Sequence, residues 1–268
     1  MGCPECNTGW ERVLSDRKVA LITGARRGIG RAIAFALAGA GFDVIGTDKV
    51  SDKDAAETAA GLAKRGKRNE FVEGDIADLG SHAALFDRIY ERYERLDCVV
   101  NNAGMMCPRE DILEAGPEDF DRVLGVNLRG TFFLTQTAAR RMLAEDPTRT
   151  GRTIVTITSA NAAMVSPEKS SYCLSKSALS MATRLFAVRL ATHGIAVFEV
   201  RPGLITTEMS GEARDRYDPM MEAGLAPMRR WGKTEEVAHT VRSLATGALA
   251  YTIGQAIDVD GGMLTFRL

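Results

Sequence analysis

The sequence has no long apolar run. Nowhere does it contain the stretch of about 18 apolar residues that a membrane-spanning helix needs. Residues 1–16 are polar and lack the apolar core of a secretory signal. We therefore expect a cytoplasmic protein with no membrane partner. The charges are nearly balanced, with a formal net charge of −1, so no general attraction to nucleic acid is expected.

Cysteine is scarce and odd in number. The five cysteines stand at positions 3, 6, 98, 107 and 173, and a chain of 268 residues does not need disulfides for stability. Cys3 and Cys6 have the spacing of metal ligands, but no second Cys or His pair completes a tetrahedral site. We therefore expect no metal and interpret residues 1–16 as a disordered tail.

Short apolar runs alternate with amphipathic stretches along almost the whole chain. The strand-like runs are residues 19–23, 44–47, 69–72, 98–101, 153–158, 196–201 and 256–259. The helical stretches are residues 30–40, 54–64, 81–94, 117–143, 171–193 and 234–246. Strands that alternate with helices of this length form βαβ units with parallel strands.

This alternation predicts an α/β fold with one domain, residues 17–268. We expect a doubly wound Rossmann fold whose seven-stranded parallel sheet has helices on both faces. One segment breaks the rhythm. Residues 207–232 are rich in Met, Gly and Pro and follow the sixth run, at the edge of the sheet where ligands bind in such folds. We interpret them as a substrate lid, with a structural insertion as the alternative.

Tyr172 and Lys176 are four residues apart in a helical stretch, so they lie on the same side of the helix. A nearby ammonium favours the phenolate, and the pair predicts a lowered tyrosine pKa. Such a tyrosine can exchange a proton with an alcohol oxygen near neutral pH. The alternative is a half-exposed tyrosine beside a solvated lysine.

The loop after the first strand has the composition of a phosphate-binding turn. Gly24, Gly28 and Gly30 follow that strand and open the first helix, where backbone N–H groups can hold a pyrophosphate. Asp48 ends the second strand, where an acid reads the ribose hydroxyls and repels a 2′-phosphate, so we expect NAD to be preferred. Arg27 beside the glycines keeps NADP possible.

Together these motifs resemble the short-chain dehydrogenase/reductase family, in its shorter single-domain branch. The matching segments are TGARRGIG at 23–30, Asp75, NNAG at 101–104, Asn127, Ser159, YCLSK at 172–176 and RPGLITT at 201–207. They occur in the family's order, and the resemblance covers about residues 17–268. It implies an NAD(P)-dependent oxidoreductase that interconverts a carbonyl and a secondary alcohol.

The resemblance also implies roles. Tyr172 would transfer the proton, and Lys176 would bind the nicotinamide ribose. Ser159 would bond the substrate oxygen, and Asn127 would anchor a water that connects Lys176 to solvent. The implied cofactor contacts are Gly24, Arg27, Gly28, Ile29, Gly30, Asp48, Asp75, Ile76, Asn102, Ala103, Gly104, Tyr172, Lys176, Pro202, Gly203, Ile205 and Thr207.

The substrate pocket is expected to be mainly apolar and flexible, which suits acyl groups. Its candidate residues are Met105, Met106, Ala160, Met164, Val165, Met209, Met220 and Met221. No charged cluster in the sequence dictates a substrate. Within the family the sequence most resembles 3-oxoacyl-[acyl-carrier-protein] reductases, although Asp48 counts against the NADPH that those enzymes usually prefer.

Several alternatives stay open. A polyol, gluconate or sugar dehydrogenase of the same family shares these motifs, and a dinucleotide-binding sensor without turnover would share the fold. Arg140, Arg141, Arg229 and Arg230 could contact an acidic acyl carrier protein, or they could be solvated surface cations. In this family, helices such as 117–143 and 171–193 pair between subunits, so a homodimer or homotetramer is expected.

Overall fold

The computed structural model describes residues 17–266, except the side chains of residues 209, 211 and 212. The expected tail at residues 1–16, with Cys3 and Cys6, lies outside this part. The centre is a seven-stranded sheet in the order β3-β2-β1-β4-β5-β6-β9, and every neighbouring pair is parallel. Its strands are β1 (Val19–Thr23), β2 (Asp43–Asp48), β3 (Glu70–Glu73), β4 (Cys98–Asn101), β5 (Arg152–Ile157), β6 (Ile195–Pro202) and β9 (Ala256–Val259).

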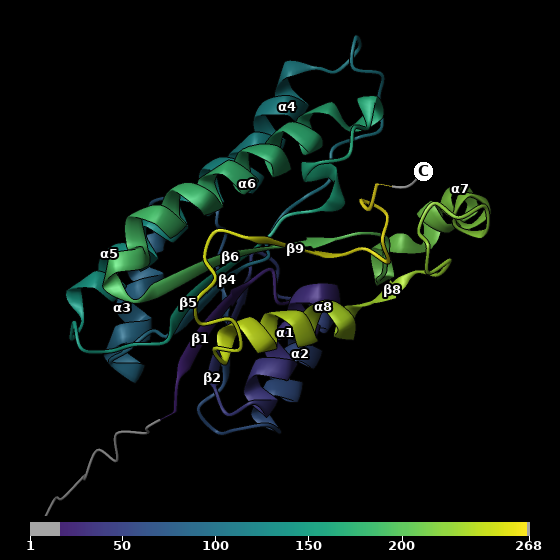
Figure 1. Cartoon of the computed structure of the whole chain (residues 1–268). Helices are drawn as coiled ribbons and strands as arrows, with labels where there is room; N and C mark the ends of the chain where they lie inside the picture. The colour runs from purple at the N-terminus through teal and green to yellow at the C-terminus, as the bar shows by residue number, and fades with distance from the viewer. Residues whose placement is uncertain (1–16, 267–268) are drawn as a thin grey trace, which may run out of the picture.

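Helices cover both faces of the sheet, as Figure 1 shows. One layer contains α1 (Gly28–Gly39), α2 (Lys53–Ala63) and α8 (Thr234–Ala245). The other contains α3 (Ser81–Tyr93), α4 (Pro117–Leu124), α5 (Thr131–Ala144) and α6 (Ser170–Leu190). Each layer encloses its own core: Leu37 and Val241 belong to the first, Phe86 and Leu134 to the second. The predicted α/β fold with a doubly wound parallel sheet is confirmed.

The expected single helix over residues 117–143 is wrong in one respect. A π-helical turn, Gly125–Gly130, separates α4 from α5. Gly130 lies so close to the loop after β3 that a β-carbon there would be 2.5 Å from the carbonyl oxygen of Ile76. The turn widens the helix at Asn127, whose side chain is fully buried. Such turns are frequent at functional sites.

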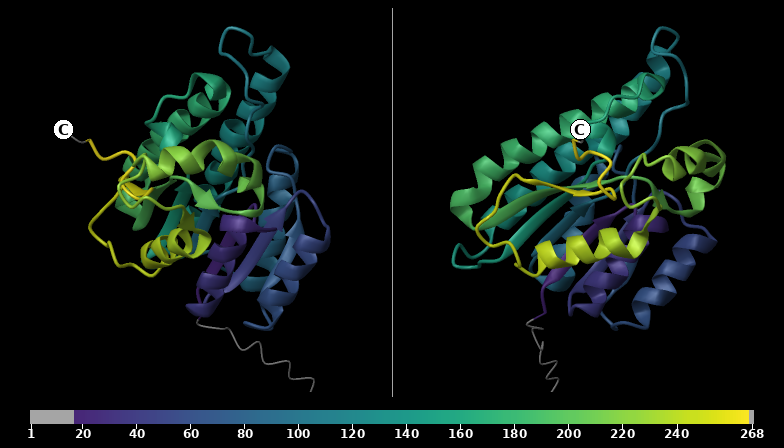
Figure 2. Two further views of the ribbon diagram at one scale, coloured as in Figure 1. Left: turned by 90° about the vertical axis from the view of Figure 1, so that its right-hand side faces the viewer. Right: turned by 45° about the vertical axis from the view of Figure 1, so that its right-hand side comes forward.

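Residues 207–231 leave the end of the sheet and return to it. Two short strands, β7 (Ile205–Thr206) and β8 (Gly232–Lys233), pair with each other and so join the two ends of this excursion. Between them α7 (Gly211–Glu222) stands beyond the sheet, away from both helical layers (Figure 2). The segment expected to be a lid is therefore a loop with a fixed base.

Within residues 17–266, none of the helices combines the length and the apolar composition needed for a bilayer crossing. The cytoplasmic location expected from the sequence stays a prediction.

Candidate functional site

A groove of about 390 Å³ runs along the carboxyl edge of the sheet. It lies over β1 and β4, where the strand order reverses, which is where open α/β sheets bind ligands. All of the cofactor contacts expected from the sequence line it: Gly24, Arg27, Gly28, Ile29, Gly30, Asp48, Asp75, Ile76, Asn102, Ala103, Gly104, Tyr172, Lys176, Pro202, Gly203, Ile205 and Thr207. The structure thus brings together motifs that are far apart in the chain.

The glycine turn can follow its course only without side chains. Gly24 and Gly28 have φ angles of +65° and +55°, a region that favours glycine. A β-carbon on Gly30 would be 2.1 Å from the carbonyl oxygen of Gly24. The turn therefore brings the N-terminus of α1, with its unpaired N–H groups, to the wall of the groove.

Thr23 joins the ends of the two central strands. Its hydroxyl oxygen accepts hydrogen bonds from the N–H groups of Asn102 and Ala103, at 3.1 and 3.0 Å. The side-chain amide of Asn102 donates in return to the carbonyl oxygens of Thr23 and Gly24, each at 3.0 Å. Asn102 therefore fixes the glycine turn, a role that only the folded structure reveals.

Two carboxylates lie at the β2–β3 side of the groove. Asp48 accepts a hydrogen bond from the N–H of Val50 at 3.3 Å, and its Oδ1 is 3.8 Å from Nε of Arg26. Asp75 accepts a hydrogen bond from the N–H of Ala77 at 2.9 Å. Each carboxylate is thus oriented by its own turn. Arg26 also lines the groove, although the sequence analysis did not single it out.

Ser159, Tyr172 and Lys176 lie at the β5–β6 side of the same groove. Ser159 follows β5, and its hydroxyl oxygen accepts a hydrogen bond from the N–H of Asn161 at 3.1 Å. Tyr172 is in the first turn of α6. The ammonium of Lys176 lies 5.7 Å from the centre of the Tyr172 ring and donates to the carbonyl oxygen of Ile157 at 3.0 Å.

Burial dominates the titration of both groups on α6. It raises the pKa of Tyr172 to about 12, although a hydrogen bond with Ser159 acts in the opposite direction. Burial also lowers the pKa of Lys176 to about 8, against the attraction of the Glu199 carboxylate. The lowered tyrosine pKa expected from the sequence is therefore wrong for this structure, because the ammonium lies over the ring and desolvation is the larger effect.

Asn127 lies behind the groove wall formed by Gly104 and Met105. Its amide oxygen accepts from the N–H of Met105 at 2.8 Å, and its amide nitrogen donates to the Met105 carbonyl at 2.9 Å. The same nitrogen donates to the hydroxyl of Ser175 at 3.1 Å. A β-carbon on Gly104 would be 3.2 Å from Oδ1 of Asn127 and 3.5 Å from the ammonium of Lys176. Asn127 thus links the loop after β4 to α6.

Glu199 is a buried residue that the sequence analysis missed. Its carboxylate accepts hydrogen bonds from the hydroxyls of Thr158 and Ser180, at 2.6 and 2.7 Å, and from Nε of Arg201 at 2.7 Å. Thr158 adjoins Ile157, which accepts from Lys176, and Ser180 is one helical turn beyond Lys176. No motif marks Glu199, since two of its three partners are distant in the sequence.

The expected substrate residues are only partly assembled. Met105 and Met106 line the groove, whereas Ala160, Met164 and Val165 do not. Val165 is 85% exposed. Met220 is exposed and Met221 is buried. The side chain of Met209 lies outside the described residues.

A charged cluster joins three loops at the lid, although no such cluster is visible in the sequence. Glu168 accepts from Arg109 at 2.7 Å and from Arg216 at 2.5 Å. The hydroxyl of Tyr217 accepts from Arg109 at 2.7 Å and from Lys169 at 3.3 Å. Burial raises the pKa of Tyr217, but the hydrogen bond from Arg109 and the charge of Lys169 outweigh it, and the net pKa is lowered. We call these five residues the lid clasp.

Comparisons with known proteins agree with this geometry. Residues 24–264 match the family model described as enoyl-(acyl carrier protein) reductase. The chain is 36% identical to a 3-oxoacyl-[acyl-carrier-protein] reductase of Synechocystis over 251 residues, which covers 93% of this chain and 98% of that one. It is 34% identical to 2-dehydro-3-deoxy-D-gluconate 5-dehydrogenase of Dickeya dadantii over 248 residues, 92% of this chain and 95% of that one.

A solved structure shows the same likeness. The 3-oxoacyl-[acyl-carrier protein] reductase of Brucella melitensis, crystallised in complex with NAD, superposes with a TM-score of 0.90 at 44% identity and covers 95% of this chain and 100% of that one. The family model, the sequence relatives and this structure all extend over nearly the whole chain. The protein therefore belongs to the short-chain dehydrogenase/reductase family of NAD(P)-dependent oxidoreductases.

Proposed function

We propose that this protein reduces a ketone to a secondary alcohol with NADH, in the manner of a 3-oxoacyl-[acyl-carrier-protein] reductase. The observation that carries the proposal is the arrangement of the groove. Ser159 and Tyr172 lie on the β5–β6 side, and Asp48 lies on the β2 side of the same groove. A dinucleotide in it would place one end beside the acid and the other beside the phenol.

Tyr172 would act as the proton donor. Burial raises the pKa of its phenol to about 12, so the phenol holds, throughout the neutral range, the proton that carbonyl reduction needs. When bound, the reduced nicotinamide supplies the hydride to the carbonyl carbon. The proton of the phenol then moves to the carbonyl oxygen, and the product is a neutral alcohol.

Ser159 would stabilise the developing charge. Its oxygen accepts from the N–H of Asn161, and its hydroxyl, which hydrogen-bonds Tyr172, would donate to the substrate oxygen when substrate is bound. A hydroxyl donor beside the phenol favours the negative charge that grows on a carbonyl oxygen during hydride transfer. This pairing of two hydroxyls suits the reduction of a carbonyl better than that of a carbon–carbon double bond.

Lys176 would orient the nicotinamide ribose, and Asn127 would act as a positioning residue. The ammonium has N–H donors left beyond its bond to the carbonyl of Ile157. It lies beside Gly104, where a β-carbon would be 3.5 Å from it. Asn127 holds Met105 and Ser175, which flank that surface. The water that Asn127 is expected to anchor stays a prediction.

NAD is the cofactor that we propose for this groove. The carboxylate of Asp48 can accept hydrogen bonds from two ribose hydroxyls, and it repels a phosphate at the same place. The relative from Brucella melitensis, at 44% identity, is described in complex with NAD. Gly24, Gly28, Gly30 and Gly104 all line the groove, so a dinucleotide could approach the backbone there.

Residues 207–231 would act as the substrate lid. Their base is fixed by the pairing of β7 with β8, while the lid clasp holds α7 against Arg109 and the start of α6. Opening would expose the side chain of Met221, which is buried, and would break hydrogen bonds that involve exposed charged side chains. Such contacts are weak enough for reversible motion.

An anionic keto sugar acid is the second candidate substrate. The lid clasp contains three cations, Arg109, Lys169 and Arg216, but one carboxylate, Glu168. Within the clasp the cations outnumber the carboxylate, so their remaining donors could bind a carboxylate on the substrate. The relative from Dickeya dadantii, named as a gluconate-type dehydrogenase, is consistent with this alternative.

An acyl carrier protein would have to approach from the lid side. Arg140 and Arg141 end α5 and precede β5, so they lie toward the amino edge of the sheet, away from the groove. Arg141 is also paired with Asp87, and Arg230 with Glu236 at 2.7 Å. Of the four cations named from the sequence, only Arg229 and Arg230 are on the lid side.

We also propose that the protein dimerises through α6. Leu174, Met181, Leu185 and Val188 are each more than half exposed, and their spacing places them on one side of the helix. An exposed apolar stripe of this kind is consistent with the pairing of α6 between subunits that the family resemblance implies. Sedimentation tests it: the wild type should run as a dimer or tetramer, and Leu185→Glu should lower the mass. A monomeric wild type would contradict it.

The function is tested by following NADH oxidation with three substrates: acetoacetyl-[acyl carrier protein], a keto sugar acid and a crotonyl thioester. The acetoacetyl substrate should give the highest kcat/KM. A higher value for the sugar acid would establish the second candidate. Reduction of the crotonyl double bond alone would contradict ketone reduction. Tight NAD binding without turnover of any of the three substrates would support the alternative of a dinucleotide-binding sensor.

A further inference from the structure

Two arginines of the glycine turn lie near Asp48, the residue expected to contact the ribose that carries the extra phosphate in NADP. Arg26 and Arg27 both line the groove, next to Asp48. A guanidinium at such a position can hold a phosphate with two parallel hydrogen bonds. A groove that favours NAD therefore contains two groups suited to NADP, and their partners decide whether they are available.

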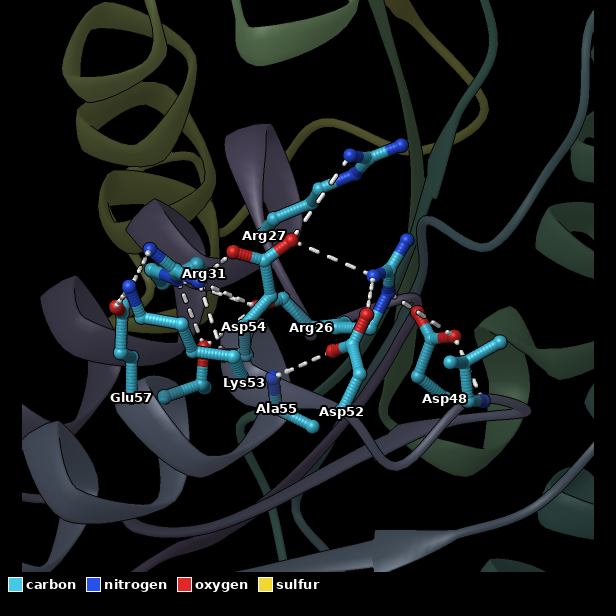
Figure 3. A network of polar contacts seen from close by, with 11 residues as sticks. Arg26, Arg27, Arg31, Asp48, Asp52, Lys53, Asp54, Ala55 and Glu57 are labelled. Carbon is cyan, nitrogen blue, oxygen red and sulfur yellow. Dashed lines mark hydrogen bonds and ion pairs between the residues drawn. The ribbon is translucent and has the colours of Figure 1, made fainter.

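Arg26 is bound to carboxylates of its own chain. Its Nη1 contacts Asp52 and is 3.3 Å from Oδ2 of Asp54, while its Nε is 3.8 Å from Oδ1 of Asp48. The Arg26 side chain is largely buried, so these contacts are partly protected from solvent. Figure 3 shows its guanidinium between Asp48 on one side and the start of α2 on the other.

Asp54 connects both arginines. Its Oδ2 lies 3.9 Å from Nη1 of Arg27 as well as 3.3 Å from Arg26. Arg31 fixes Asp54 from behind, donating to its backbone carbonyl at 2.9 Å and to Oδ1 at 3.5 Å (Figure 3). Asp54 is thus held in place by the chain, and its carboxylate faces the two guanidinium groups.

Asp52 is held as firmly. It is the N-cap of α2 and accepts from the N–H of Ala55 at 3.1 Å. That hydrogen bond is the largest cause that lowers the pKa of Asp52, so the carboxylate stays charged through the neutral range. The two guanidinium groups are therefore matched by three carboxylates: Asp48, Asp52 and Asp54.

We propose that Asp52 and Asp54 are specificity-determining residues for the cofactor, because they bind Arg26 and Arg27 internally and so keep both arginines from a 2′-phosphate. This inference rests on the proposed preference for NAD. Asp48 repels the phosphate directly, while Asp52 and Asp54 remove its partners. Replacing Asp48 alone should then be insufficient to make the groove accept NADP.

Calorimetric titration with NAD⁺, NADP⁺ and adenosine 2′,5′-bisphosphate tests the proposal without any substrate. The background is Asp48→Ser, to which Asp52→Asn and Asp54→Asn are added. Asparagine retains the N-cap acceptor and the size of the side chain and removes only the charge. The added pair should raise the affinity for NADP⁺ and the bisphosphate by about tenfold or more, and the gain should shrink with salt. NAD⁺ affinity should change little.

Glu57→Gln is the matched control. Glu57 is on the same helix, 3.5 Å from Arg31 and 3.9 Å from Lys53. The substitution therefore removes one negative charge, as each aspartate substitution does, but from beside Arg31 and Lys53 instead of Arg26 and Arg27. It should leave NADP⁺ affinity unchanged. Adding Arg26→Gln to the triple variant should abolish the gain. If the triple variant folds poorly, Asp54→Asn in the Asp48→Ser background frees Arg27 while Asp52 still holds Arg26, and it should give a smaller gain in NADP⁺ affinity.

An unchanged NADP⁺ affinity in the folded variants would overturn the proposal, and so would an equal gain from Glu57→Gln. A wild type that binds NADP⁺ more tightly than NAD⁺ would instead refute the proposed cofactor preference. The two failures are distinguishable, because one is read from the difference between variants and the other from the wild type alone.

Discussion

The cofactor side of the groove is built from strand ends, whereas the substrate side is built from loops. Asp48 closes β2, Asn102 follows β4, and Pro202 closes β6, so the register of the sheet fixes where these residues lie. Met106 and Val165 stand on loops whose course depends on contacts such as that of Arg109 with Glu168. Backbone pairing between strands therefore determines the cofactor side. The substrate side depends on side-chain contacts between loops that are distant in the sequence.

This difference explains what the sequence could predict. The strands were expected to within one or two residues, because apolar runs and turn residues are local signals. Every expected cofactor contact lines the groove, since most lie at or just after a strand end and the others are at the start of α1 or near the start of α6. Of the expected substrate residues whose side chains the structure describes, only Met105 and Met106 do so. The lid clasp, Glu199 and the π-helical turn are products of tertiary contacts between distant segments.

The largest expected effect is at the cofactor side. Gly30→Ala places a β-carbon 2.1 Å from the Gly24 carbonyl oxygen, so the turn must move away from the groove. We expect NAD affinity to be lost in calorimetry and the free energy of unfolding to fall by about 1–3 kcal/mol.

Gly39→Ala, at the end of the same helix, is the control. A β-carbon there would meet nothing within 4 Å, so the change should stabilise the protein by about 0.5–1 kcal/mol and leave NAD binding intact. Equal behaviour of the two variants would contradict the account of the glycine turn.

Lys176→Met tests the residue that joins the two sides. Turnover should be lost, because the ribose and Tyr172 lose their cation. Stability should rise by at most about 3 kcal/mol at pH 7, since the folded pKa is about 8 against an ordinary 10.5. The unfolded chain holds this proton more tightly, so burial of the charge costs most below pH 8.

The stability difference should therefore shrink as the pH rises from 8 to 10.5. Denaturant unfolding at several pH values measures it. A variant that is less stable than the wild type at pH 7, or a difference that does not depend on pH, would show that Lys176 is not a desolvated cation.

Glu199→Gln tests how a buried charge controls the pKa of Lys176. The Glu199 charge raises the pKa of Lys176, so its removal should lower that pKa further. The alkaline fall of kcat/KM for NADH, which reports the free enzyme, should move to lower pH. At pH 6.5 the rate should change by no more than about twofold, because Lys176 is still charged there.

Asp258→Asn is the control for Glu199. Asp258 lies 3.9 Å from Arg201, which also pairs with Glu199. Its substitution should leave the pH profile of kcat/KM unchanged. An equal displacement of the profile in both variants would mean that Arg201, and not the charge beside Lys176, controls the titration.

The smallest effect is expected at the lid clasp. Glu168→Gln removes the carboxylate that holds Arg109 and Arg216, so KM should rise about two- to fivefold while NAD affinity stays the same. Glu222→Gln, at an exposed carboxyl of α7, should change neither value. A loss of NAD affinity in Glu168→Gln would show that the substrate loops also shape the cofactor side.

The central claim is that Tyr172 delivers the proton at one end of a preformed cofactor groove. Tyr172→Phe, titrated with NAD⁺ and assayed for NADH-dependent ketone reduction, tests it most directly, with Tyr90→Phe as a control away from the groove. We expect unchanged NAD⁺ affinity, and turnover reduced by about 10²- to 10⁴-fold in Tyr172→Phe alone. Turnover that survives in Tyr172→Phe would contradict it.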